Sequence, residues 1–143
     1  MGLSYNEKYK HWNTKDPIDI GKITFNSKKG ILFNNSEDND ENRKALISRY
    51  QGGKFSKDDK INSPTAGLGH EIIHAGNFLL DNANYFQRQE PFKNVDKNGF
   101  TNNEEIRTTI LSNQVNEALN EPQRQVYWGI KIPTESVTSN KVK

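Results

Sequence analysis

The spacing of apolar residues predicts β-structure near the start of the chain and two helices further on. Residues 18–25, IDIGKITF, are rich in β-branched residues that alternate with polar ones, which is typical of a half-buried strand. The turn-forming sequence NSKKG and the apolar run ILF at 31–33 follow. We therefore predict a β-hairpin over this stretch, closed at Gly30.

A helix is predicted from residue 63 to residue 80. Ser63 is a favourable N-cap, and Pro64 fits the first helical position. Gly67 and Gly69 weaken the helix by roughly 1 kcal/mol each relative to alanine, so we expect another backbone to approach it closely. The apolar residues at helical spacing are Leu68, Ile72, Ala75 and Leu79.

A second helix is predicted to begin near residue 101 and to end before Pro122. Residues 101–103 supply caps, and Glu104 and Glu105 suit the positive end of the helix dipole. Its apolar side consists of Ile106, Ile110, Leu111, Val115, Ala118 and Leu119. The weaker patterns predict a short helix at 43–50, loops at 51–62 and 81–100, and a strand or extended segment at 125–132.

The length of 143 residues indicates a single domain, and the predicted strands and helices make its class α+β. Only 31% of the residues are hydrophobic and the mean hydropathy is −0.97, so the core must be small. We expect a poorly defined extension at 1–17 and a compact domain at 18–133, in which the hairpin packs on the first helix. The polar residues 134–143 are expected to form a frayed tail.

Charge and cysteine content exclude several classes of function. The net charge is +2 with both signs interspersed, and no Lys/Arg stripe with aromatic residues points to nucleic acid. The chain has no cysteine, which rules out disulfides, thiolate zinc sites and cysteine nucleophiles. No apolar run approaches membrane-spanning length, and the N-terminus does not have the pattern of a signal peptide.

The sequence GLGHEIIHAGNF at 67–78 carries the clearest chemical signal. On a helix, His70 and His74 lie on one face, one turn apart, and can direct both imidazoles at one metal ion. Glu71 is rotated by about 100° from His70, so it can act as a general base without ligating the metal. This H-E-x-x-H spacing is that of zinc metallopeptidases. The alternative is a capped amphipathic helix that merely carries a surface histidine pair.

A zinc site of this kind needs a third protein ligand. The remaining histidine, His11, lies far upstream, and Asn77 and Leu80 stand where the metzincin pattern requires glycine and histidine. We therefore expect a carboxylate ligand. The downstream candidates are Asp81, Glu90, Asp96, Glu104, Glu105 and Glu117.

The second helix favours two of these candidates, because a rigid element positions a ligand well. Glu105, Thr109 and Asn113 form a polar stripe at i, i+4 and i+8, which favours Glu105 over Glu104. The alternative is that both glutamates only interact with the helix dipole.

The order of these motifs resembles the zincin metallopeptidase domains at the C-termini of bacterial polymorphic toxins, RHS-repeat toxins included, and related secreted effector peptidases. The resemblance is carried by KITFNSKKGILF, SPTAGLGHEIIHA, NNEEIRTT and SNQVNEALNEPQRQVYWG, over about residues 22–128. The chain departs from the family pattern at Ser112 and Asn116, where the family has glutamate and arginine.

The resemblance implies His70, His74 and either Glu104 or Glu105 as zinc ligands, and Glu71 as general base. It also implies that Arg124 or Tyr127 lies near the site, where either could donate to the oxyanion of the transition state. The alternatives are a surface or salt-bridged arginine and a core aromatic residue. It further implies a zinc endopeptidase, gluzincin-like in its third ligand, whose substrate is a protein or peptide. Such a domain would be secreted or delivered into a target cell as part of a larger toxin, with an immunity protein or the parent chain as partner. Two alternatives are a zincin-like binding module without activity and a peptidase that processes its own parent chain.

Overall fold

The computed structural model describes residues 2–3, 5–6, 11–12 and 22–143. Within these residues the domain is α+β, as predicted, and combines four helices with a three-stranded antiparallel sheet. The helices are α1 (Asp40–Gly52), α2 (Pro64–Leu80), α3 (Asn82–Arg88) and α4 (Asn103–Ala118). The main sheet has the strand order β6 (Asp59–Asn62), β5 (Lys29–Asn34) and β7 (Ile130–Pro133).

Two further strand pairs lie near the start of the chain. They join β1 (Gly2–Leu3) to β4 (Ile23–Thr24) and β2 (Tyr5–Asn6) to β3 (His11–Trp12), both antiparallel.

The predicted hairpin between residues 18–25 and 31–33 is wrong. A turn does form locally, because the N–H of Lys29 donates to the carbonyl of Asn26 over 3.3 Å. However, β4 pairs with β1, while β5 has β6 on one side and β7 on the other. Gly30 does not close a turn. A Cβ at this position would lie 2.4 Å from the carbonyl oxygen of Asn62, so glycine permits the close packing of β5.

Burial of both faces of β5 explains its central position in the sheet. Leu32 and Phe33 are completely buried on opposite faces of the sheet, so both faces must be covered. On one face, α1 buries Leu46, and Arg49 of α1 bonds to Asp59 of β6. The main core cluster is Leu32, Phe33, Leu46, Val126, Trp128 and Ile132.

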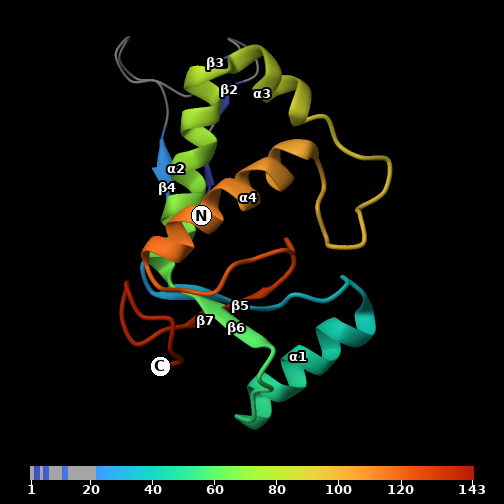
Figure 1. Ribbon diagram of the computed structural model, residues 1–143, viewed down its shortest axis with the longest axis vertical. Coiled ribbons are helices and arrows are strands. Elements are labelled where there is room, and N and C mark those ends of the chain that lie inside the picture. Colours follow the sequence, from blue (N-terminus) through green and yellow to red (C-terminus); the bar gives the residue numbers. More distant parts are fainter. Residues whose placement is uncertain (1, 4, 7–10, 13–21) are drawn as a thin grey trace.

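The two longer helices on the other side of the sheet begin as the sequence predicts. The Ser63 hydroxyl accepts from the N–H of Ala66, and the Asn102 side chain accepts from the N–H of Glu105. Figure 1 shows α4 crossing α2, with the first turn of α2 standing on the sheet and α1 at the far end of the sheet. Gly69 lies at this crossing, where an added Cβ would be 2.9 Å from Cγ1 of Val115. Gly69 therefore has a close neighbour, but this neighbour is a side chain of α4 and not the backbone that we expected.

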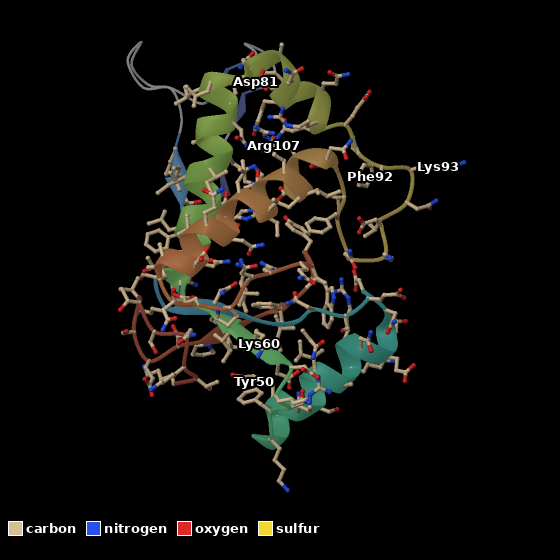
Figure 2. The ribbon with its side chains drawn as sticks, viewed as in Figure 1. Tyr50, Lys60, Asp81, Phe92, Lys93 and Arg107 are labelled. Atoms are coloured by element: carbon tan, nitrogen blue, oxygen red, sulfur yellow. The ribbon has the colours of Figure 1, made fainter. Side chains whose placement is uncertain are left out.

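Two segments predicted as loops contain regular structure. Residues 51–62 include β6, and residues 81–100 include α3. Asp81 stands at the corner between α2 and α3 (Figure 2).

The polar C-terminal tail, for which we expected fraying, forms hydrogen bonds with the domain. The carbonyl of Val137 accepts from both the N–H and the hydroxyl of Thr65, at 3.0 and 2.8 Å. Thr134 is buried and forms a β-bridge with Val142. Backbone hydrogen bonds make these contacts, so the polar composition of the tail does not prevent them.

Candidate metal centre

His70 and His74 face one glutamate of α4. The two imidazole rings lie one turn apart on α2, with centroids separated by 4.8 Å. Nε2 of His70 is 3.3 Å from Oε2 of Glu105, and Nε2 of His74 is 3.1 Å from the same oxygen. The crossing of α2 and α4 therefore brings together residues that are more than thirty positions apart.

The arrangement of these three side chains fits a metal ion. Their ligand atoms all lie within 4.8 Å of one another. Ligands at 2.0–2.1 Å from a tetrahedral ion are roughly 3.3 Å apart, which is close to the two observed nitrogen–oxygen distances. Two imidazoles and one carboxylate are also a donor set that transition metals accept. The group of His70, His74 and Glu105 can thus hold a metal ion.

Glu104 does not join this group, although the sequence left it open as a ligand. Its Oε2 is 2.8 Å from Nδ1 of His74, on the side of the ring away from Glu105. The same oxygen accepts from the hydroxyl of Thr108 at 2.8 Å and from the side-chain amide of Asn77 at 3.0 Å. A carboxylate in this position fixes the orientation of the imidazole and leaves Nε2 directed at the group.

The contacts of Glu104 extend to α3. Its Oε1 accepts from Nε of Arg88 at 2.8 Å, and Nη1 of Arg88 is 3.2 Å from Asp81. Sequence analysis missed Asn77, Thr108 and Arg88. The spacing held a partial signal, since Asn77 follows His74 by three residues and Thr108 follows Glu104 by four, which places each pair on one helix face.

Electrostatics within the group follow from burial and these hydrogen bonds. Burial alone would raise the pKa of Glu104 and Glu105, but hydrogen bonds outweigh it and lower both to about 2. The bonds come from His74, Asn77, Thr108 and Arg88 for Glu104, and from His70 and His74 for Glu105. Burial alone would lower the pKa of His74, whereas hydrogen bonds to Glu104 and Glu105 raise it to about 9. A metal ion bound at Nε2 would therefore replace a proton.

A cleft of about 300 Å³ opens beside His70. Glu71 and Gly67 line this cleft from the same helix, α2. Strands β5 and β7 and the segment between α4 and β7 form the other walls. Their charged and aromatic lining residues are Lys29, Arg124, Tyr127 and Lys131.

Arg124 and Tyr127 both line the cleft, so the structure brings the two predicted oxyanion donors to the site. The guanidinium of Arg124 is directed at its own chain segment. Its Nη2 donates to the carbonyl oxygens of Tyr127 and Trp128, the latter at 3.3 Å. Asn113 fixes the backbone of Arg124 by accepting from its N–H at 2.7 Å and donating to its carbonyl at 2.9 Å. The stripe that favoured Glu105 therefore also contains the residue that holds Arg124.

Tyr127 keeps its phenolic proton over the whole physiological range. Burial, together with the negative charges of Glu105 and Glu71, raises its pKa to about 12. Its ring centroid lies 5.8 Å from that of Phe100, and its N–H donates to the carbonyl of Asn98 at 2.9 Å. These contacts hold the side chain beside the cleft as a hydrogen-bond donor.

The other positions singled out from the sequence lie elsewhere. His11 is in β3, and its side chain is outside the described residues. At the two departures from the family pattern, Ser112 donates to the carbonyl of Thr109, and Asn116 donates to Oδ1 of Asn113. Both are buried polar residues of α4 that bond within that helix.

Comparison of the chain with protein-family models, with curated proteins and with solved structures gave no match. Among the described residues, no helix combines the length and apolar character that crossing a bilayer requires.

Proposed function

We propose that this protein is a zinc-dependent peptidase. One observation carries the proposal: the Nε2 atoms of His70 and His74 converge on Oε2 of Glu105, while Glu71 lines the adjoining cleft. The H-E-x-x-H helix thereby has its carboxylate partner, its base and a space for substrate in one place. This combination is that of hydrolytic zinc sites with two histidines and one glutamate.

The residues around the group have separate tasks in peptide hydrolysis. Zinc, when bound, supplies Lewis acidity that polarises the substrate carbonyl and lowers the pKa of a water molecule to about 7. The carboxylate of Glu71 accepts a proton from the attacking water and returns it to the leaving amine. The phenol of Tyr127 donates a hydrogen bond to the oxygen on which negative charge develops. Glu104 keeps His74 oriented.

The Glu71→Gln variant tests the mechanism. Removal of a general base costs about 10²- to 10⁴-fold in rate, so cleavage of a quenched fluorescent peptide library should fall by that factor. Bound zinc, measured by elemental analysis, should stay equimolar because Glu71 is not a ligand. Glu117→Gln is the matched control, since Glu117 is an exposed glutamate of α4. Full peptidase activity in Glu71→Gln would refute the mechanism.

The metal itself is tested by chelation. Removal of zinc should abolish cleavage and lower the melting temperature, because the metal binds only the folded arrangement of α2 and α4. Bound zinc without any cleavage would favour the alternative of a binding module.

We further propose that the peptidase serves as the toxic part of a secreted or delivered protein. Support comes only from the motif order that resembles toxin peptidases. Expression of the wild-type chain inside bacterial cells should arrest their growth, and expression of Glu71→Gln should not. Equal growth with both proteins, at equal expression, would refute this role.

A further inference from the structure

Cations outnumber carboxylates in the lining of the cleft beside the metal group, which consists of His70, His74 and Glu105. Lys29, Arg124 and Lys131 reach it from three different parts of the chain, whereas Glu71 is the sole carboxylate among its lining residues. Lys29 and Lys131 are exposed, and neither ammonium forms an ion pair within the part of the chain that the structure describes. These positive charges are therefore available to a ligand.

Strand register explains why the two lysines gather on one side of the cleft. Ile31 of β5 is the pairing partner of Lys131 of β7, and Lys29 lies two positions before Ile31. Alternation along a strand places Lys29 and Ile31 on the same face of the sheet, and a cross-strand partner shares that face. Both lysines thus flank Ile31, which supplies an apolar floor between them.

Arg124 adds a charge that solvent reaches less easily. Its guanidinium centre lies 5.6 Å from the ring centroid of Phe33, and its Nε is buried without a hydrogen-bond partner. No carboxylate among the described residues forms an ion pair with it. A buried guanidinium whose hydrogen bonds go only to carbonyl oxygens is stabilised by an anion in the adjoining space.

We infer that this cleft binds a carboxylate group of the substrate, with Lys29, Lys131 and Arg124 as the residues that determine specificity. The inference rests on the proposed peptidase function for its position next to the scissile bond. The carboxylate has two possible sources, an aspartate or glutamate side chain and a free C-terminus. A cleft of about 300 Å³ is at the small end of ligand sites, so it suits a short part of a peptide.

Three isosteric probes distinguish these sources without any turnover. N-acetylglutamate α-amide has only a side-chain carboxylate, N-acetylglutamine has only an α-carboxylate, and N-acetylglutamine α-amide has neither. Each is titrated into the purified protein while the amide NMR signals of Gly67 and Gly129, which line the cleft, are followed. We expect one or both acids to shift these signals, and the neutral amide not to do so. Equal shifts from all three probes would overturn the inference.

A double variant, Lys29→Gln with Lys131→Gln, tests whether the cleft lysines are responsible. The affinity for the acidic probes, obtained from the titration, should fall by about three- to tenfold, as expected for the loss of two solvent-exposed charge contacts. Lys44→Gln with Lys54→Gln is the control, because it removes the same charge from exposed positions outside the cleft. Unchanged affinity in the Lys29/Lys131 variant, or an equal loss in the control, would also overturn the inference.

Cleavage gives an independent measure. The ratio of kcat/KM for a peptide that carries the favoured carboxylate to that for its amide isostere should exceed one, and it should fall in the Lys29/Lys131 variant. A ratio of one in the wild type would refute the inference while leaving the peptidase function intact. Absence of cleavage of every peptide would count against the peptidase function alone, and the probe titration would then decide the inference.

Discussion

Replacement of Glu104 by glutamine separates the task of this residue from that of its neighbour Glu105. Glu104 is 1% exposed and accepts from His74, Asn77, Thr108 and Arg88. Glutamine has the same shape, but its amide group places a donor against other donors. The variant therefore keeps the packing of α2 against α4 and removes the charge behind His74.

The expected losses follow from these contacts. Loss of a partner behind a metal-bound histidine lowers metal affinity by about 10- to 100-fold. The pair formed with Arg88 is largely buried, since the side chain of Arg88 is 18% exposed and that of Glu104 is 1% exposed. Breaking such a pair by removing one partner costs about 3 kcal/mol, here reduced somewhat because Asp81 also bonds to Arg88. We expect a loss of about 2–3 kcal/mol in the free energy of unfolding.

Zinc affinity is measured by competition with a chromophoric chelator, and unfolding by urea in metal-free buffer. Glu121→Gln is the control, because Glu121 accepts from the N–H and hydroxyl of Ser63, at 2.7 and 2.6 Å, and does not contact either histidine. It should lose about 1–2 kcal/mol of stability with zinc affinity nearly unchanged. Wild-type zinc affinity in Glu104→Gln would refute the idea that Glu104 orients His74.

Two further predictions concern the scaffold. Burial alone would raise the pKa of Asp59, but hydrogen bonds, above all that from Arg49, outweigh this effect and lower the pKa to about 2. A carboxyl group whose pKa is lowered in the folded state stabilises the fold above its ordinary pKa of 3.8, and this stabilisation is lost as the pH falls toward the pKa of the folded state. The difference in the free energy of unfolding between wild type and Asp59→Asn, about 2 kcal/mol at pH 4, should therefore largely disappear when urea midpoints are measured at pH 2. In Gly69→Ala the new methyl group meets Val115 at 2.9 Å, and the clash should outweigh the gain in helix propensity, for a net loss of about 1 kcal/mol. Addition of Val115→Ala should restore the urea midpoint, and a stabilised single variant would contradict the proposed close contact.

Local signals in the sequence predicted the helices well because their caps and spacing act within one turn. Ser63 and Asn102 cap α2 and α4 in the structure, as expected for N-cap residues. The polar stripe favoured Glu105 over Glu104, and in the structure Glu105 is the glutamate that lies near both Nε2 atoms. Helix periodicity carries this information because it determines which side of α4 is polar.

Local patterns of this kind do not predict which strands pair with one another. β6 is the stretch DKIN, whose only apolar residue is Ile61, so nothing in its pattern distinguishes it from a loop. It becomes a strand because β5 buries both faces and offers hydrogen bonds on both edges. The contact of Glu104 with Nδ1 of His74 could not be predicted either, because it depends on the angle at which α4 crosses α2.

The attachment of the C-terminal tail has a consequence for the order of events during synthesis. All three residues of the metal group have left the ribosome once residue 105 has emerged. The start of α2, however, is bonded to Glu121 and Val137, which are translated later. A nascent chain therefore carries every ligand before it possesses the contacts that anchor the helix bearing two of them. Pulse-labelled chains that end at residue 118 and at residue 143, each followed by a linker that spans the exit tunnel, should differ in their protection from protease.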